Sequence, residues 1–285
     1  MKNIRCLFFV SFVLAAVSVS ASAQTPKSHW ATFEGAKLHY YDIGKGNKKA
    51  IVFIHGWTCN ADFWSDSLNA FPNYRVIALD LPGHGQSDKP KASYTMEYFA
   101  RSVDAVLKAA KVQQAVLVGH SMGTPIARQY YRLYPDKVKG IVIVDGSLAP
   151  FFSKEQGDQL LAAFRKDFKG TSTQFVTTMI QPIKSDAIKK KITDAMLTAP
   201  DYVAVSAMEG MMDERIWTTD KIGVPVLAVM AQSPWVNADT KKRFETIAPD
   251  LDFQLWPGVS HFLMMEKPDE FNNAVRSFVV KNKLL

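Results

Sequence analysis

The chain has 285 residues, of which 47% are hydrophobic. This length and composition favour one large globular domain, or one domain with an insertion, with enough apolar residues for a large core. The formal net charge of +7 is spread along the chain, and its densest run, Lys189 to Lys191, has no aromatic residues interleaved. That pattern favours a solvated helix face and argues against a nucleic-acid partner.

Residues 1–23 have the pattern of a secretory signal peptide. Lys2 and Arg5 form a basic start, residues 6–19 form an uncharged apolar run, and Ala-Ser-Ala at 21–23 matches a cleavage site. The apolar run is shorter than the ~20 residues that span a bilayer. We therefore expect cleavage near Ala23 and export to the periplasm or the medium, rather than an uncleaved membrane anchor.

The mature chain would begin at Gln24 and carry a net charge of +5, because two basic residues leave with the signal peptide. It keeps a single cysteine, Cys59, so no internal disulfide is expected. A buried small residue is predicted there rather than a reactive thiol, because no basic side chain lies between Trp57 and Asp62. No other segment is apolar and long enough to cross a membrane.

Strands and helices alternate along the mature chain. Two strand-like pieces around Gly35, within residues 32–42, predict an N-terminal hairpin. Later apolar runs are typical of strands buried on both faces of a parallel sheet. The predicted fold class is α/β, with a mostly parallel doubly wound sheet and helices on both faces. The later strands are predicted at 50–54, 75–80, 115–118, 140–145, 225–230 and 252–256, and helices at 96–110, 124–133 and 269–281.

The alternation breaks between about residues 147 and 220. This stretch contains no convincing strand, and its Met and Phe residues recur at near-helical spacing. We predict a helical cap inserted between two strands of the sheet, so residues 24–285 form one domain with an insertion. The helical pieces are predicted at 153–168, 171–180, 185–197 and 200–213.

The strand at 115–118 leads directly into a G-x-S-x-G sequence, residues 119–123, and a helix follows. This is the context of a nucleophile elbow, a sharp turn from which a serine oxygen projects. Such a turn requires glycine two residues before and two residues after Ser121, because larger side chains would clash with the neighbouring strand and helix. We predict that Ser121 is a nucleophile. A helix-capping serine in a glycine-rich turn is the alternative.

Four motifs now occur in order: His55-Gly56, the D-L-P-G-H-G-Q-S segment at 80–87, the elbow, and G-V-S-H at 258–261. In this order the chain resembles an α/β-hydrolase-fold protein with a cap, over residues 30–285. The resemblance implies that His261, after the last strand, is the general base. It also implies an oxyanion hole formed by the backbone N–H groups of Trp57 and Met122. Structural hydrogen bonding is expected for the other histidines of the mature chain, namely His29, His39, His55, His84 and His120.

The third member of the triad departs from the family pattern. Most relatives carry an acid after the strand at 225–230, but Ser233 stands there and cannot supply a full negative charge to an imidazolium. Some members of the fold use an acid at the end of the strand after the elbow helix, which is where Asp145 lies. The resemblance therefore favours Asp145 as the acid that orients His261. Asp239 is a second candidate, and a slower site without an acid is a third.

A serine at the elbow implies acyl transfer, because haloalkane dehalogenases and epoxide hydrolases of this fold carry an aspartate there. Ser121 would form an acyl-enzyme, and water activated by His261 would hydrolyse it. No metal or organic cofactor is implied, because the sequence has no Cys–His cluster with zinc spacing and no phosphate loop.

We therefore expect an exported carboxylesterase that acts on a small-molecule ester with an apolar acyl group, and the oligomeric state stays open. The same serine would serve a lactonase, a carbon–carbon hydrolase, a perhydrolase or an aminopeptidase. The missing late acid leaves a weakly active or non-catalytic ligand-binding protein as a further alternative. Candidates for an adaptable apolar pocket, or for plain core packing, are Phe151, Phe152, Met208, Met211, Met212, Trp217, Met264 and Met265.

Overall fold

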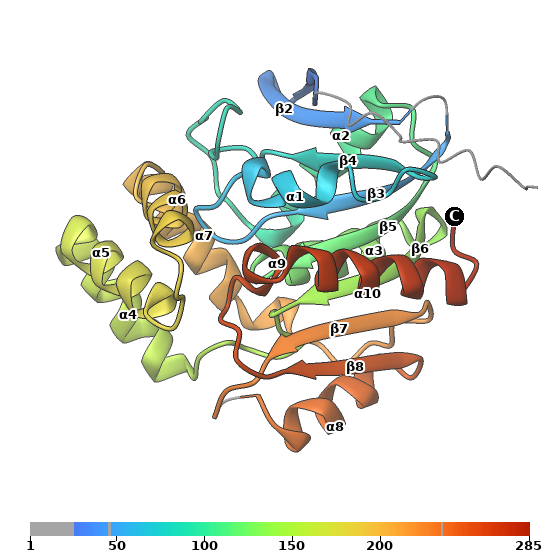
Figure 1. The fold of residues 1–285 in the computed structure, drawn as a ribbon. Helices are drawn as coiled ribbons and strands as arrows, with labels where there is room; N and C mark the ends of the chain where they lie inside the picture. The colour runs from blue at the N-terminus through green and yellow to red at the C-terminus, as the bar shows by residue number, and fades with distance from the viewer. Residues whose placement is uncertain (1–25, 45–46, 235) are drawn as a thin grey trace, which may run out of the picture.

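A computed structural model of the chain describes residues 26–285, apart from residues 45, 46 and 235. The proposed signal peptide, residues 1–23, lies outside the described residues. The described residues form one eight-stranded sheet in the order β1-β2-β4-β3-β5-β6-β7-β8 (Figure 1). The β1–β2 and β2–β4 pairs are antiparallel and the other pairs are parallel. The strands are β1 (Ser28–Phe33), β2 (Ala36–Ile43), β3 (Lys49–Ile54), β4 (Arg75–Leu79), β5 (Gln114–His120), β6 (Val138–Val144), β7 (Val226–Ala231) and β8 (Leu251–Trp256).

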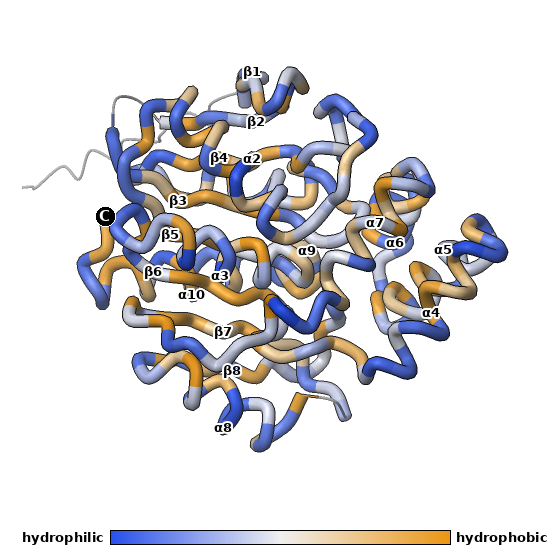
Figure 2. The backbone as a smooth tube through the Cα atoms, turned by 180° about the vertical axis from the view of Figure 1, so that it is seen from behind, coloured by the Kyte–Doolittle hydropathy of each residue, from blue (hydrophilic) through white to orange (hydrophobic). Residues whose placement is uncertain are grey.

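The inner strands form the core of the molecule. All six residues of β7 are buried, as are all but the first residue of β3. Continuous apolar sequence suits these strands because helices cover both faces of the sheet. The hydrophobic tracts in Figure 2 follow β3, β5, β6 and β7. The predicted α/β fold class is confirmed, and the predicted strands lie within two residues of the observed bounds except at β1, which begins four residues earlier.

Helices pack on both sides of this sheet. α10 (Pro268–Lys281) crosses the front of the sheet in Figure 1, with α1 (Ser65–Leu68) and α9 (Leu263–Glu266) beside it. α2 (Met96–Ala109) and α3 (Gly123–Leu133) pack together on the far side. α8 (Ala238–Ile247) lies against β8. Across the residues that the structure covers, no helix has the length and apolar character that crossing a bilayer requires.

Four helices lie between β6 and β7, and we call them the helical insert: α4 (Lys154–Lys166), α5 (Phe168–Ile180), α6 (Asp186–Met196) and α7 (Asp201–Met212). The insert stands at the left of the sheet in Figure 1. Side-chain caps set its helix starts, because Ser153, Asp167 and Ser185 each accept a backbone N–H of the first turn. The Asp167 cap starts α5 at Phe168, three residues earlier than hydrophobic spacing predicts.

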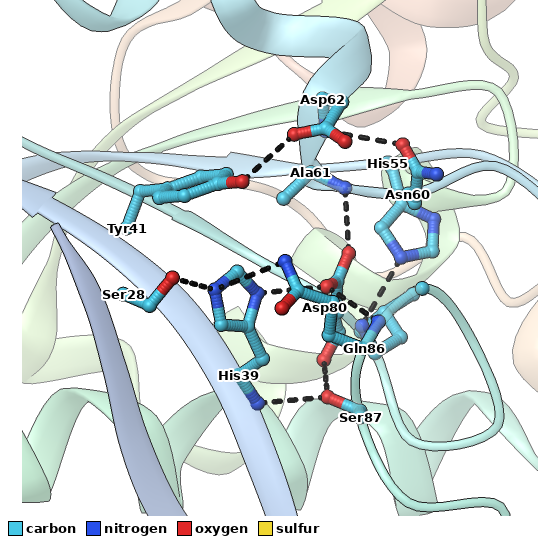
Figure 3. Close-up of polar contacts among 12 residues, drawn as sticks. Ser28, His39, Tyr41, His55, Asn60, Ala61, Asp62, Asp80, Gln86 and Ser87 are labelled. Atoms are coloured by element: carbon cyan, nitrogen blue, oxygen red, sulfur yellow. Dashed lines mark hydrogen bonds and ion pairs between the residues drawn. The ribbon is translucent and has the colours of Figure 1, made fainter. Parts of the chain in front are cut away.

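The carboxylate of Asp80, directly after β4, joins three segments of chain (Figure 3). It lies 2.8 Å from His39 Nδ1 of β2, and it accepts the backbone N–H groups of Ala61 and Gln86 at 2.7 and 2.9 Å. Burial acts to raise the pKa of Asp80, but these hydrogen bonds outweigh burial and the pKa is lowered. The ionised carboxylate therefore holds the N-terminal hairpin and the loops after β3 and β4 together.

Two buried histidines lie beside this junction and stay neutral. His55 Nδ1 lies 2.8 Å from the carbonyl oxygen of Gly56, and His84 Nδ1 lies 3.0 Å from that of Pro82. A carbonyl only accepts, so both Nδ1 atoms carry the proton. His55 Nε2 is then free to accept the N–H of Leu81 at 3.1 Å. Burial lowers the pKa of His55, and it lowers the pKa of His84 to about 3.

We predict that mild acid destabilises this fold before most carboxylates titrate. Below a pH of about 6.5 the unfolded chain binds protons at His55 and His84, whereas the folded chain keeps both neutral. The contribution of these two histidines to the stability of the fold is therefore present above pH 6.5. It is lost as the pH falls towards their lowered pKa values in the folded chain. For each histidine that stays neutral in the folded chain, the free energy of unfolding falls by roughly 2 kcal/mol between pH 7 and pH 5. Urea unfolding at both pH values measures this loss.

The control for this experiment is a pair of histidine variants. His84→Gln removes one buried titrating group, so it should lose less stability than wild type over the same pH interval. His29→Gln changes an exposed residue and should lose as much as wild type. An equal loss in His84→Gln and wild type would contradict the prediction.

Candidate active site

Ser121 lies on the sharp turn between β5 and α3. Its φ is +51°, a left-handed backbone conformation that non-glycine residues adopt only when the surrounding structure imposes it. The Ser121 N–H donates to the carbonyl oxygen of Val144 in β6 at 3.0 Å, and the Ser121 carbonyl accepts the N–H of Thr124 at 2.9 Å. The turn is therefore anchored to the neighbouring strand and to the start of the helix.

Close backbone packing explains the glycines of this turn. A Cβ on Gly119 would lie 2.3 Å from the carbonyl oxygen of Gly123, and one on Gly123 would lie 2.3 Å from that of Ile54. A Cβ on Gly56 would lie 3.2 Å from Ser121 Cβ. The loop after β3 thus passes directly against the serine, and glycine at these positions allows that approach.

His261 and Asp145 form a close polar pair. His261 Nδ1 lies 2.7 Å from Asp145 Oδ2, with side chains 23% and 14% exposed. A carboxylate accepts, so Nδ1 carries the proton and Nε2 is left with its lone pair. The other oxygen of Asp145 accepts the N–H of Ala231 at 2.8 Å, and the Asp145 N–H donates to Val229 at 2.9 Å. Both ends of Asp145 are therefore held by β7.

The second acid candidate lies elsewhere. Asp239 is exposed in the first turn of α8, and its carboxylate lies 3.9 Å from Lys242 Nζ. Ser233, at the position where most relatives carry the acid, forms an isolated β-bridge with Val236. Of the two candidate acids, the structure brings Asp145 to His261.

His120 contacts the backbone of His261. Its Nε2 donates to the His261 carbonyl oxygen at 2.8 Å, and the two ring centroids are 4.6 Å apart. Burial lowers the pKa of His120 well below its ordinary value, so the ring is neutral. The sequence predicted a structural hydrogen bond here but not its partner, which lies 141 residues further along the chain.

The backbone N–H groups of Trp57 and Met122 are candidate oxyanion donors. Within the described part of the chain, neither the Trp57 N–H nor the Met122 N–H forms a hydrogen bond to the protein. Trp57 follows Gly56, and Met122 follows Ser121 and precedes α3. The Trp57 side chain is held separately, because its Nε1–H donates to the carbonyl oxygen of Ala204 in α7 at 2.8 Å. Both N–H groups are therefore available to a bound oxygen.

Ser121 and His261 line one cavity of about 390 Å³, which we call the inner cavity. Its volume is within the usual range for a small-molecule site. Among the described residues that line it there is no Asp, Glu, Lys or Arg side chain. The lining residues are Trp57, Cys59, His120, Ser121, Phe151, Phe152, Phe175, Met179, Met196, Met208, Met211, His261 and Phe262.

The sequence found part of this lining. Of the predicted pocket residues, Phe151, Phe152, Met208 and Met211 line the inner cavity. Met264 and Met265 are instead buried in α9, and Met212 and Trp217 line a neighbouring cavity. Phe175, Met179 and Met196 were missed, because nothing in the sequence distinguishes these residues of α5 and α6 from ordinary helix packing.

Cys59 also lines the inner cavity but is buried. Its side chain is part of the hydrophobic core, and burial raises the pKa of the thiol. The prediction of a buried small residue at this position is confirmed. Across the residues that the structure describes, no three His, Cys, Asp or Glu side chains converge as metal ligands would.

The sequence of this chain is similar to known protein sequences. A family model described as alpha/beta hydrolase fold matches residues 49–181. The AB hydrolase superfamily protein YisY of Bacillus subtilis (strain 168) is 29% identical over 261 residues, which cover 87% of this chain and 97% of that protein. These matches span the elbow and most of the sheet.

Solved structures agree in fold across nearly the whole chain. Est816, described as an N-acyl homoserine lactone degrading enzyme, is 28% identical with a TM-score of 0.75, over 88% of this chain and 100% of its own. A thermophilic esterase is 25% identical with a TM-score of 0.71, over 90% of this chain and 99% of its own. These homologues indicate a hydrolase. The sheet order, the strained elbow and these relatives together show that the chain has the α/β-hydrolase fold.

Proposed function

We propose that this protein is a serine carboxylesterase that hydrolyses small esters with apolar acyl groups. One observation carries the proposal: His261, which is paired with Asp145 at 2.7 Å, lines the same cavity as a serine on a strained turn. A histidine that is oriented by a carboxylate and leaves Nε2 unprotonated is the group that activates a serine hydroxyl.

The proposed mechanism assigns each group a task. Ser121 Oγ attacks the ester carbonyl carbon while His261 Nε2 takes the hydroxyl proton. The N–H groups of Trp57 and Met122 stabilise the negative oxygen of the tetrahedral intermediate. His261 then protonates the departing alcohol, which leaves an acyl group on Ser121. Water, deprotonated by His261, releases the acid, and Asp145 stabilises the imidazolium in both steps.

The lining of the inner cavity supports an apolar substrate. Phenylalanine and methionine side chains from the insert line the cavity that Ser121 also lines. Charged side chains would be needed to bind an acidic acyl group. Methionine adapts to irregular shapes, so this pocket suits a range of acyl groups. The similarity to a thermophilic esterase supports the same reaction class.

Lactone hydrolysis is the second candidate function. A lactone is a cyclic ester, so the same nucleophile and base would open it without further groups. The observation that favours it is the similarity to Est816, which is described as an N-acyl homoserine lactone degrading enzyme. Rates on an ester series and on γ-lactones, measured with one enzyme preparation, rank the two reactions.

We also propose that the protein is exported after cleavage between Ala23 and Gln24. The basic start, the apolar run and the Ala-Ser-Ala sequence support this proposal. The full chain, expressed in a bacterium with a secretory pathway, should yield a periplasmic or secreted product whose intact mass begins at Gln24. A membrane-bound product that retains residues 1–23 would contradict export by cleavage.

The esterase proposal predicts a serine-dependent preference for acyl chain length. Wild-type protein beginning at Gln24 should hydrolyse p-nitrophenyl esters, with a maximum set by the inner cavity, and Ser121→Ala should abolish turnover. A folded wild-type protein without turnover on any ester would overturn the proposal. A folded protein that also fails to react with a fluorophosphonate would support the binding-only alternative.

Asp145→Asn should lower kcat by roughly 10²-fold or more, because the amide leaves the imidazolium unstabilised. Asp239→Asn is the matched control and should retain wild-type turnover, because its carboxylate is exposed on α8. Steady-state kinetics and thermal melts of both variants separate catalysis from folding. If Asp239→Asn loses turnover while Asp145→Asn keeps it, the assignment of the acid is wrong.

A further inference from the structure

A second cavity of about 580 Å³, which we call the outer cavity, lies beside the inner cavity. The two cavities share three lining residues, Phe151, Phe152 and Met211. Ser121 lines only the inner cavity. Three side chains that face both cavities form a wall between them, and we call these three residues the partition.

The partition stands where the chain enters and leaves the insert. Phe151 and Phe152 lie in the segment between β6 and α4, and Met211 lies at the end of α7. Phe151 packs edge-to-face on Trp217, with ring centroids 5.7 Å apart at 81°. The Trp217 Nε1–H donates to the Met211 carbonyl oxygen at 2.9 Å. The entering and leaving segments therefore brace each other at the partition.

Arg128 of α3 fastens both segments to the helix that follows Ser121. Its side chain is buried, and its guanidinium donates to the Leu148 carbonyl at 3.1 Å on the entering side. On the leaving side it donates to the Thr218 carbonyl and to the Asp220 carboxylate. The partition is thereby held at a fixed place relative to the nucleophile, which a wall that limits substrate length requires.

The two cavities differ in chemical character. Apolar side chains dominate the inner cavity. The outer cavity has charged residues of both signs, including the Lys154–Asp158 pair at 2.7 Å and the Arg215–Asp213 pair at 2.6 Å. A polar but nearly uncharged group matches this mixed rim, whereas a plain hydrocarbon chain matches the inner cavity.

We propose that Phe151, Phe152 and Met211 determine substrate length, and that the outer cavity receives the polar far end of an amphiphilic ester. A short apolar chain ends at the partition and is bound wholly beside Ser121. A longer substrate reaches the outer cavity only by displacing these three side chains, which slows its reaction, and it then places its polar end among the charged residues. This inference rests on the proposed nucleophile Ser121.

Covalent labelling with alkyl fluorophosphonates of increasing chain length tests the proposal. The rate of Ser121 labelling is measured for wild type and for Phe151→Ala, Phe152→Ala and Met211→Ala. Removing part of the partition joins the cavities, so these variants should label about tenfold faster with long chains relative to short ones. Adding a polar group at the far end of the long chain should increase the advantage further.

Matched controls change the inner cavity without changing the partition. Met179→Ala is paired with Met211→Ala, and Phe175→Ala with Phe152→Ala, because Met179 and Phe175 line the inner cavity only. These controls should shift the preference towards long chains much less than the partition variants do, because the partition still separates the two cavities. A shift as large in the controls as in the partition variants, or no shift in either, would overturn the proposal.

A variant with a larger side chain keeps the test decisive if the alanine variants fold poorly. Phe152→Trp enlarges the partition and should move the preference towards shorter chains, and thermal melting checks its fold. Failure of wild type to react with any fluorophosphonate would refute the nucleophile, and so the proposed function. Labelling of Ser121 with chain-length profiles that the partition variants leave unchanged would refute the partition alone.

Discussion

The sharp turn at Ser121 is the constraint on which the site depends. A φ of +51° costs a non-glycine residue roughly 1–3 kcal/mol, and the turn persists because close backbone packing leaves the chain no other course. Gly119 and Gly123 approach each other and the end of β3 within distances that a Cβ would forbid. The same packing brings Gly56 against the serine. Both proposed oxyanion donors are therefore next in sequence to residues of this close contact, since Met122 follows Ser121 and Trp57 follows Gly56.

The parallel sheet supplies the other proposed members of the site. Adjacent parallel strands end at one edge, so residues that directly follow β5 and β6 become neighbours in space. Asp145 is fixed there by two hydrogen bonds with the backbone of β7, and it is aligned with His261 from the loop after β8. The insert then covers this edge with apolar side chains. Substrate preference would therefore be a property of the insert, and bond cleavage a property of the sheet.

Local sequence predicted the elements whose burial is uniform. β3 and β7 are continuous apolar runs, and both appear where they were expected. α8 was not predicted, because it buries only three of its ten residues and most of the others are polar. Its Asn237 capping box was the signal available for it. Helix starts in the insert likewise follow caps such as Asp167 more closely than hydrophobic spacing.

Some residues of the candidate site could be predicted from local sequence, and others could not. Ser121 could be predicted from the residues around it, whereas His261 and Asp145 required the resemblance to a known fold. The His120–His261 contact and the cavity lining from α5 and α6 depend on packing between distant segments, which a single sequence does not encode in a readable pattern. The partition between the two cavities is of this kind, since it exists only once the insert is placed on α3.

The most direct test of the central claim is to map the covalent adduct that a fluorophosphonate forms with the wild-type protein. Peptide mass spectrometry, with and without a competing ester, identifies the modified residue. A nucleophilic Ser121 predicts one adduct, located on Ser121 and suppressed by the ester. An adduct on another residue, or ester hydrolysis that persists in Ser121→Ala, would contradict the claim that Ser121 is the nucleophile.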